Sequence, residues 1–138
     1  MGCPRVIVID THVLVWWANG TAEKLSRRAR YHLARVEKID GGILISAISA
    51  WEVAVLISKG RLTLAMDADD WLTHAAALPG VRFIPVDRHI AVQSLRLPEP
   101  FHADPADKMI VATARSLNFP LVTADKGIHR YPHVKTVW

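Results

Sequence analysis

Short, continuously apolar runs alternate along this chain with longer segments of helical character. The first run, Arg5–Ile9, is rich in β-branched residues and lacks polar alternation, which is typical of a strand covered on both faces of a parallel sheet. We predict further strands at Ile43–Ser46, Val81–Val86, Leu121–Thr123 and Val134–Trp138. Strands that alternate with helices predict an α/β fold of three layers, with a mainly parallel central sheet flanked by helices.

The segments between these strands carry helix signals. Ser49, followed three residues later by Glu52, is typical of a capping box. Asp87 can cap a helix, and Asp104-Pro105 is a cap followed by proline at the first helical position. The predicted helices are Thr11–Ala18, Glu23–Ile39, Ala50–Lys59, one that Asp67 or Asp69 caps and that ends at Leu78, Arg88–Leu95, Pro105–Asn118 and, as a turn or short helix, Asp125–Arg130.

Composition narrows the class of protein. The chain has 138 residues, which corresponds to one domain with one sizeable core, so we expect residues 1–138 to form a single domain. Its apolar runs are far shorter than the roughly 20 residues that a membrane span needs. The only cysteine, Cys3, excludes an internal disulfide and a cysteine-based zinc site, and it fits a reducing cytoplasm as an inert thiol. A formal charge of +4 suits a polyanionic partner.

Several carboxylates fall where the predicted strands end. Asp10 directly follows the first strand, Asp125 comes two residues after Leu121–Thr123, and Glu52 and Asp107 lie in the first turns of their helices. The carboxyl ends of parallel strands share one edge of a sheet, so these acids should converge there. Carboxylates that converge repel each other unless a cation is present, and oxygen ligands suit Mg²⁺ or Mn²⁺. The pattern predicts a metal site that activates water for an in-line phosphodiester displacement.

Each acid also has a simpler interpretation. Asp10 can cap the helix that follows it, Glu52 can complete the capping box, and Asp125 can be an ordinary turn residue. Asp107 favours a helix dipole from the first turn, and Asp104 is better explained as a cap than as a metal ligand. The coincidence of all five on one edge favours a site over five separate structural roles.

Four stretches, in this order, resemble the motifs of PIN-domain ribonuclease toxins of the VapC type. The first is VIDTHVLVWW at Val8–Trp17, and the second is ISAISAWEVA at Ile45–Ala54, with KGRL following at Lys59–Leu62. The third is HADPADKMIVATA at His102–Ala114, and the fourth is LVTAD at Leu121–Asp125. The resemblance covers nearly the whole chain.

The resemblance implies a PIN fold, an Mg²⁺-dependent endoribonuclease that leaves 5′-phosphate and 3′-hydroxyl ends, a cognate VapB-like antitoxin and a homodimer. It carries metal-binding roles onto Asp10, Glu52 and Asp107, with Asp125 as the fourth acid. Thr123 matches the small hydroxyl residue near that acid. After the third acid the family usually has arginine, whereas this chain has lysine at position 108, and Lys108 offers phosphate a charge but no bidentate fork.

Cations and aromatic residues near the predicted edge are candidates for further roles. If the substrate is RNA, four cations are candidate phosphate contacts and predict salt-sensitive binding. We interpret the tryptophans at positions 16, 17, 51 and 71 as core or interface residues rather than base-stacking platforms, and His12 as structural. The four candidate cations are Lys108, Lys126, Arg130 and Arg61.

Two rival functions remain. One is another α/β phosphotransfer domain, but Asp10 is followed by Thr11-His12 rather than by the second aspartate that a haloacid-dehalogenase-type phosphatase needs, and the chain has no glycine-rich phosphate loop. The other is a non-catalytic PIN-like RNA-binding module, against which the complete set of acids argues. The RNA target, the number of metal ions and the identity of the antitoxin stay open.

Overall fold

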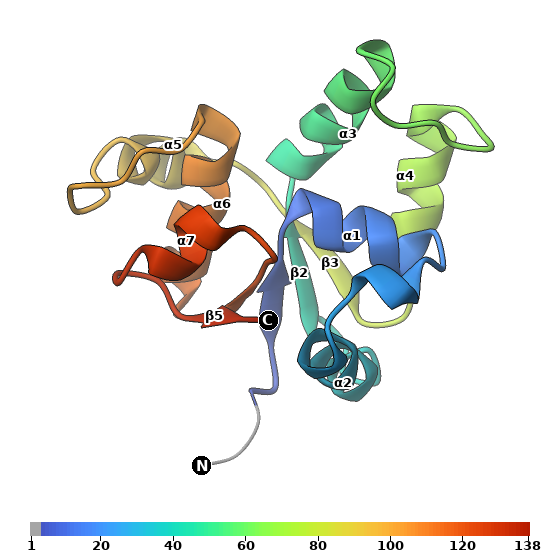
Figure 1. Ribbon diagram of the computed structural model, residues 1–138, viewed down its shortest axis with the longest axis horizontal. Coiled ribbons are helices and arrows are strands. Elements are labelled where there is room, and N and C mark those ends of the chain that lie inside the picture. Colours follow the sequence, from blue (N-terminus) through green and yellow to red (C-terminus); the bar gives the residue numbers. More distant parts are fainter. Residues whose placement is uncertain (1–3) are drawn as a thin grey trace.

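Five parallel strands form the centre of the computed structural model, which describes residues 4–138 and therefore leaves Cys3 outside the described residues (Figure 1). Their order across the sheet is β3-β2-β1-β4-β5, and each neighbouring pair is parallel. The strands are β1 Ile7–Ile9, β2 Ile43–Ser46, β3 Val81–Ile84, β4 Leu121–Val122 and β5 Thr136–Val137. The predicted fold class is confirmed.

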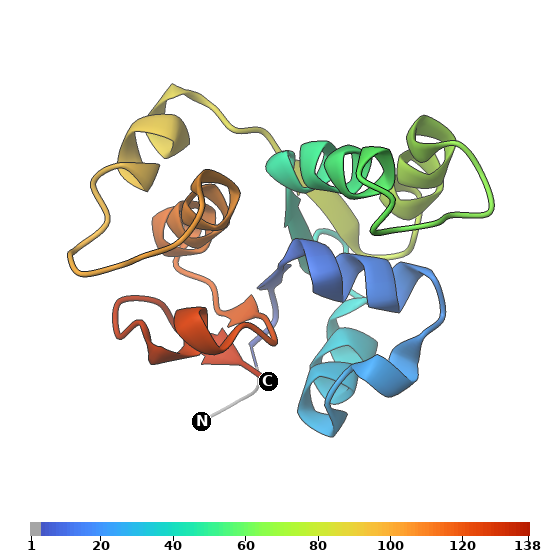
Figure 2. The ribbon, with the colours of Figure 1, turned by 45° about the horizontal axis from the view of Figure 1, so that its top comes forward.

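Helices cover both faces of this sheet and complete three layers. Helices α1, α2 and α4 pack on one face, and α5, α6 and α7 pack on the other. Figures 1 and 2 show the two groups on opposite sides of β1. The helices are α1 Thr11–Ala18, the 3₁₀ helix η1 Ala22–Lys24, α2 Arg27–Val36, α3 Ile48–Ser58, α4 Ala68–Ala76, α5 Arg88–Ser94, α6 Pro105–Leu117 and α7 Lys126–Arg130.

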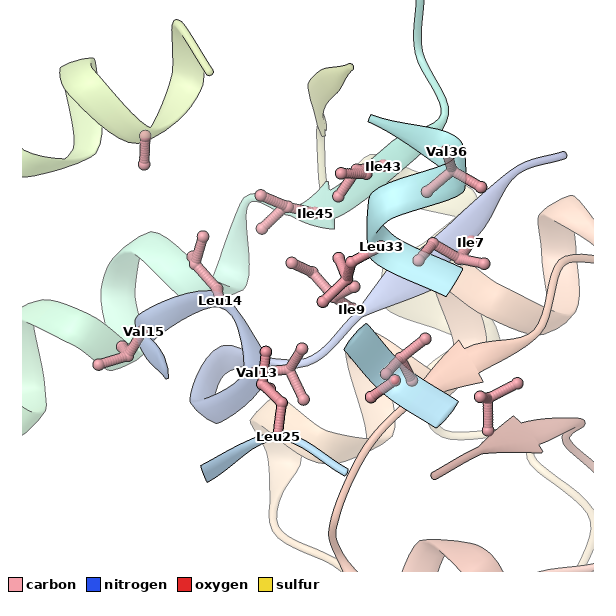
Figure 3. Packing of buried hydrophobic residues seen from close by; sticks show 14 of the residues in the cluster. Ile7, Ile9, Val13, Leu14, Val15, Leu25, Leu33, Val36, Ile43 and Ile45 are labelled. Carbon is pink, nitrogen blue, oxygen red and sulfur yellow. The ribbon is translucent and has the colours of Figure 1, made fainter. Parts of the chain in front are cut away.

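The side chains of β1 divide between two hydrophobic clusters. Ile7 and Ile9 belong to the cluster under α1 and α2, whereas Val8 belongs to the cluster under α5 and α6. Figure 3 shows Ile7 and Ile9 packed against Leu33 and Val36 of α2. Successive strand residues point to opposite faces, so a strand with both faces covered must be apolar throughout, as the sequence predicted.

The predicted helix Glu23–Ile39 is wrong as a single element. The structure has the short 3₁₀ helix η1, then extended Leu25, and α2 begins only at Arg27. Leu25 is buried in the core, and the Oγ of Ser26 accepts a hydrogen bond of 3.0 Å from the amide of Ala29. Burial of one leucine together with a serine cap outweighs the helical spacing of the segment.

The start of α3 also differs from the prediction. The helix begins at Ile48 after Ala47, which makes no side-chain cap, and Ser49 lies inside the first turn and is fully buried. The predicted capping box between Ser49 and Glu52 is therefore wrong. The predicted caps Asp87 and Asp104 are confirmed.

The direction of strand order reverses between β1 and β4. Chain order runs from β1 through β2 to β3 on one side, and β4 and β5 follow on the other side of β1. In open α/β sheets, such a switch point leaves a crevice at the carboxyl ends of the strands. The loops that lead into α1, α3 and α7 leave β1, β2 and β4 at this edge. In the part of the chain that the structure describes, no helix is long and apolar enough to cross a membrane.

Candidate active site

A pocket of about 430 Å³ opens at the carboxyl edge of the sheet. Five of its residues are carboxylic acids, contributed by four separate parts of the chain. Helix α3 contacts both α1 and α6, and this packing brings the acids of distant segments together. We call this cavity the acidic pocket; it is lined by Asp10, Thr11, His12, Trp16, Glu52, Asp104, Asp107, Ala124 and Asp125.

Asp10 is the most buried of these acids, with 7% of its surface exposed. It caps α1, because its Oδ1 accepts a hydrogen bond of 2.9 Å from the amide of Val13. Its Oδ2 accepts a hydrogen bond from the hydroxyl of Thr123, which is itself fully buried. Thr123 also accepts from the amide of Asp125 at 3.1 Å. The carboxylate of Asp10 is therefore held in one orientation by α1 and by the end of β4.

Glu52 is the fifth residue of α3 and lines the pocket, and a hydrogen bond joins it to α1. Its Oε1 lies 2.5 Å from the hydroxyl of Thr11, and that hydroxyl lies 2.9 Å from the hydroxyl of Ser49. One hydroxyl carries one proton, so Thr11 donates to the carboxylate and accepts from Ser49. The serine that was predicted to cap α3 instead supports Glu52 through Thr11.

Asp104 and Asp107 face Glu52 from the start of α6. Asp104 caps this helix, since its Oδ1 accepts a hydrogen bond of 2.8 Å from the amide of Asp107. Oxygen atoms of Glu52, Asp104 and Asp107 lie within 4.8 Å of one another. Asp104, which the sequence favoured as a cap alone, therefore has both a capping role and a place among the candidate ligands.

Asp125 is the fifth acid that lines the pocket. It is exposed, and its Oδ1 caps α7 by accepting a hydrogen bond of 3.0 Å from the amide of Ile128. Asp10, Asp104 and Asp125 each combine a helix cap with a position in the pocket. The structural and the functional interpretations of these acids are thus compatible.

The electrostatics of the pocket oppose ionisation of Asp10, Glu52 and Asp107. Burial, followed by repulsion from Asp104, Glu52, Asp125 and Asp10, raises the pKa of Asp107 to about 7. Burial also raises the pKa of Asp10 and of Glu52, although the hydroxyls that they accept from lower it in part. Among the described residues that line the pocket there is no lysine or arginine. A bound cation would relieve the repulsion between these acids.

The donor set fits a hard dication. All the convergent side chains offer carboxylate oxygen, and oxygen atoms from Glu52, Asp104 and Asp107 lie close enough to share one ion. The pocket is larger than such a cluster requires, which leaves space for water and for a phosphate group. Mg²⁺ and Mn²⁺ prefer this chemistry, whereas zinc sites draw on nitrogen and sulfur.

Of the four cations that the sequence offered as phosphate contacts, one lines a cavity next to the acidic pocket, and three do not. Arg61 lines a second cavity, which adjoins the acidic pocket, together with Lys59. Lys108, Lys126 and Arg130 line neither of these two cavities among the described residues. Lys126 is the first residue of α7, next to its cap Asp125, and Arg130 is the last residue of this helix.

The structure places Trp71 as the sequence predicted, whereas Trp51 and His12 have positions that the sequence did not predict. Trp71 is buried, as predicted, and its indole donates to Asn19 at 2.9 Å. Trp51, however, is 59% exposed, so of the two predicted roles, core or interface, it does not have the core role. His12 is exposed and lines both cavities, and its charge lowers the pKa of Asp10 and Glu52. The positions of Trp51 and His12 depend on helix packing, and no local pattern signals them.

A family model and a known relative each match nearly the whole chain, and both belong to the same family. A family model described as PIN domain matches residues 7–134. Ribonuclease VapC22 of Mycobacterium tuberculosis is 33% identical over 134 residues, which cover 96% of this chain and 98% of that protein.

Solved structures share the fold at lower identity. The structure of VapBC2 from Rickettsia felis, bound to a DNA fragment from their promoter, aligns with a TM-score of 0.69 and 18% identity, over 96% of this chain and 98% of the other. FitAcB from Neisseria gonorrhoeae aligns with a TM-score of 0.65 and 22% identity, over 96% and 97% of the two chains.

Proposed function

Because the chain belongs to the PIN-domain family, in its VapC-type branch, we propose that it is an Mg²⁺-dependent endoribonuclease toxin. One observation carries the proposal: five carboxylates line a single pocket without a lysine or arginine among the described lining residues, and the pKa of one of them is raised to about 7. Such a cluster is costly unless a cation binds it. The name of the relative from M. tuberculosis supports RNA as the substrate.

We assign metal binding to Asp10, Glu52, Asp107 and Asp125, and we add Asp104 because its oxygen lies within 4.8 Å of those of Glu52 and Asp107. Mn²⁺ is the alternative cation. When bound, the dication lowers the pKa of the attacking water and stabilises charge on the leaving oxygen of the phosphodiester.

The chain's own residues orient this centre. Thr123 and the amide of Val13 fix both oxygens of Asp10, and Thr11 fixes Glu52. A carboxyl must lose its proton before it can bind a metal. Asp107, with a pKa of about 7, therefore couples metal binding to proton release near neutral pH.

We also propose partners for the chain. Its place in the VapC-type branch supports a cognate VapB-like antitoxin that neutralises it, and the name VapBC2 of a structure with the same fold agrees with this proposal. We further propose a homodimer, a single domain over residues 1–138, and action on RNA in the cytoplasm. Co-purification of a small protein partner with the tagged chain tests the antitoxin proposal, and the mass of the free protein in solution tests the homodimer.

The decisive experiment is cleavage of total RNA by the purified protein with and without Mg²⁺. We expect EDTA to abolish cleavage, Mg²⁺ to restore it, and Asp107→Asn to lower the rate about a thousandfold. Asp67→Asn is the matched control, because Asp67 caps α4 and lies outside the acidic pocket, and asparagine caps as well as aspartate.

Two outcomes would overturn the proposal. Full activity in EDTA would exclude the metal role. RNA binding without cleavage under any divalent cation would identify a non-catalytic RNA-binding module instead.

A further inference from the structure

A second cavity, of about 330 Å³, adjoins the acidic pocket along α3. The two cavities share His12, Glu52 and Asp104. We call the second cavity the α3 groove. Its other lining residues are Trp51, Val55, Leu56, Lys59, Arg61, Pro105 and Ala106.

One stripe of α3 forms the floor of this groove. Trp51, Val55 and Lys59 are spaced four residues apart and therefore lie on one face of the helix. From Trp51 to Lys59, which is the C-cap of α3, the stripe advances by eight residues, or about 12 Å along the helix axis. The side chains change along it from an aromatic ring beside the acids to a cation at the far end.

Trp51 is the most unusual residue of the stripe. It is 59% exposed, although tryptophan is mostly buried in folded proteins. The neighbouring Glu52 points into the acidic pocket, so the indole stands beside the candidate metal ligands. An exposed ring at this place offers a flat apolar surface to whatever the acids act on.

Charge is distributed unevenly along the groove. The carboxylates of Glu52 and Asp104 lie at the end shared with the acidic pocket, and Lys59 and Arg61 lie at the other end. An occupant that reaches both ends must suit a metal-bound acid cluster, an aromatic face and two cations. A nucleotide has this combination, since its base stacks on aromatic rings and its phosphates attract lysine and arginine.

The size and the position of the groove favour RNA over a protein segment. Its volume lies at the lower end of the range for small-ligand sites, which suits a single nucleotide better than a folded helix. It also opens directly into the acidic pocket. When a phosphodiester of an RNA molecule reaches the acids, the nucleotide next to that phosphodiester therefore lies beside Trp51.

We propose that the α3 groove binds the nucleotide adjacent to the cleaved phosphodiester: Trp51 stacks on its base, and Lys59 and Arg61 contact the phosphates beyond it. This proposal rests on the proposed function, because it takes RNA as the substrate of the acidic pocket. It gives Trp51 a part in substrate selection, since stacking favours an unpaired base over a paired one.

Binding to RNA, measured without cleavage, tests the groove. Fluorescein-labelled oligo(U) and oligo(A) are titrated in Mg²⁺ against the Asp107→Asn protein, and fluorescence anisotropy gives the dissociation constant. In this background we expect Trp51→Ala to weaken binding about tenfold and Trp51→Phe to retain most of the affinity. Replacing Lys59 and Arg61 together with alanine should lower the slope of log affinity against log salt by about 1.4, from two contacts to single-stranded nucleic acid.

The control is Tyr31→Ala. Tyr31 is also a large exposed aromatic residue, at 51%, but it lies on α2 and lines neither cavity; its replacement should leave RNA affinity unchanged.

The outcomes separate the two proposals. If the wild-type protein cleaves RNA but Trp51→Ala binds and cleaves as the parent does, the groove proposal is wrong and the proposed function stands. If Trp51→Ala instead weakens only self-association or antitoxin binding, the groove is a protein interface, which also overturns the proposal. Absence of any Mg²⁺-dependent cleavage by the wild type contradicts the proposed function, whereas the anisotropy titration still reports on the groove.

Discussion

The hydrophobic cluster under α1 and α2 and the acidic pocket meet at two consecutive residues. Ile9 is fully buried among apolar side chains, and Asp10, the next residue, is nearly as buried but lies among other acids. Burial stabilises the folded state in the first region and raises the pKa of the carboxyl group in the second. The fold is thus stabilised by its core while it holds a site that, without a cation, reduces stability.

The largest expected effect lies on the core side of this comparison. Ile9→Ala should lower the free energy of unfolding by about 3–4 kcal/mol, because it removes buried methyl groups and leaves a cavity. Urea denaturation measures the change. Leu95→Ala is the control: Leu95 is 82% exposed, so its replacement should change stability by less than about 0.5 kcal/mol. An equal loss for both variants would contradict the assignment of the core.

Without a cation the acidic pocket should lower the free energy of unfolding, and bound Mg²⁺ should make the pocket raise it. At about one hundred times its dissociation constant, the ion should raise the free energy of unfolding by about 2.7 kcal/mol, since it binds only the folded state. Urea denaturation with Mg²⁺ or with EDTA measures the difference. Asp107→Asn should lose most of this gain, whereas Asp67→Asn should keep it. A gain of equal size in all three proteins would point to a metal site elsewhere.

The stability of the metal-free protein should fall as the pH rises from about 4 to about 7. Asp107 has a folded-state pKa of about 7 against an ordinary value of 3.8, so between these values the folded state holds a proton that unfolding releases. The pKa of Asp10 and of Glu52 is shifted in the same direction.

In EDTA at pH 8, Asp107→Asn should therefore be more stable than the parent by about 1.5 kcal/mol. This value is smaller than the full shift implies, because solvent screens a partly exposed carboxylate. At pH 4 the two proteins should be equally stable. A parent protein whose stability rises through this range would contradict the raised pKa.

Thr123→Val is expected to have the smallest effect. It removes the hydroxyl that donates to Asp10 and should cost about 1 kcal/mol, while cleavage falls because Asp10 loses its fixed orientation. Thr113→Val is the matched control, since Thr113 is equally buried but bonds only to the carbonyl of Met109 within α6. Equal cleavage by both variants would show that Thr123 does not position Asp10.

The fold could be predicted from the sequence because the signals for its helices and strands lie within the segments that form them. The bounds of Thr11–Ala18 and Ile43–Ser46 agree with the structure, and the cap at Asp104 is where the sequence indicated it. These signals depend on apolar periodicity and on short polar residues next to helix starts, both of which a single segment contains.

The connections within the site could not be predicted in the same way. Thr11 and Ser49 are separated by 38 positions and Thr123 and Asp10 by 113, yet they form hydrogen bonds. Ser49 in particular carries a strong local signal for a helix cap, and it is packing between α1 and α3 that assigns it a different role. Strand order placed the acids on one edge, but the contacts between them depend on tertiary structure.

The position of β4 in the sheet has a consequence for the timing of activity during synthesis. This strand lies beside β1 at the centre of the site, but it comes late in the chain, and Thr123 and Asp125 follow it. A polypeptide that emerges from the ribosome amino end first exposes Asp10 and Glu52 long before these two residues. A nascent chain would therefore lack the support for Asp10 and part of the pocket lining, and under the proposed function it would spare the RNA that surrounds it until β4 and Asp125 have emerged.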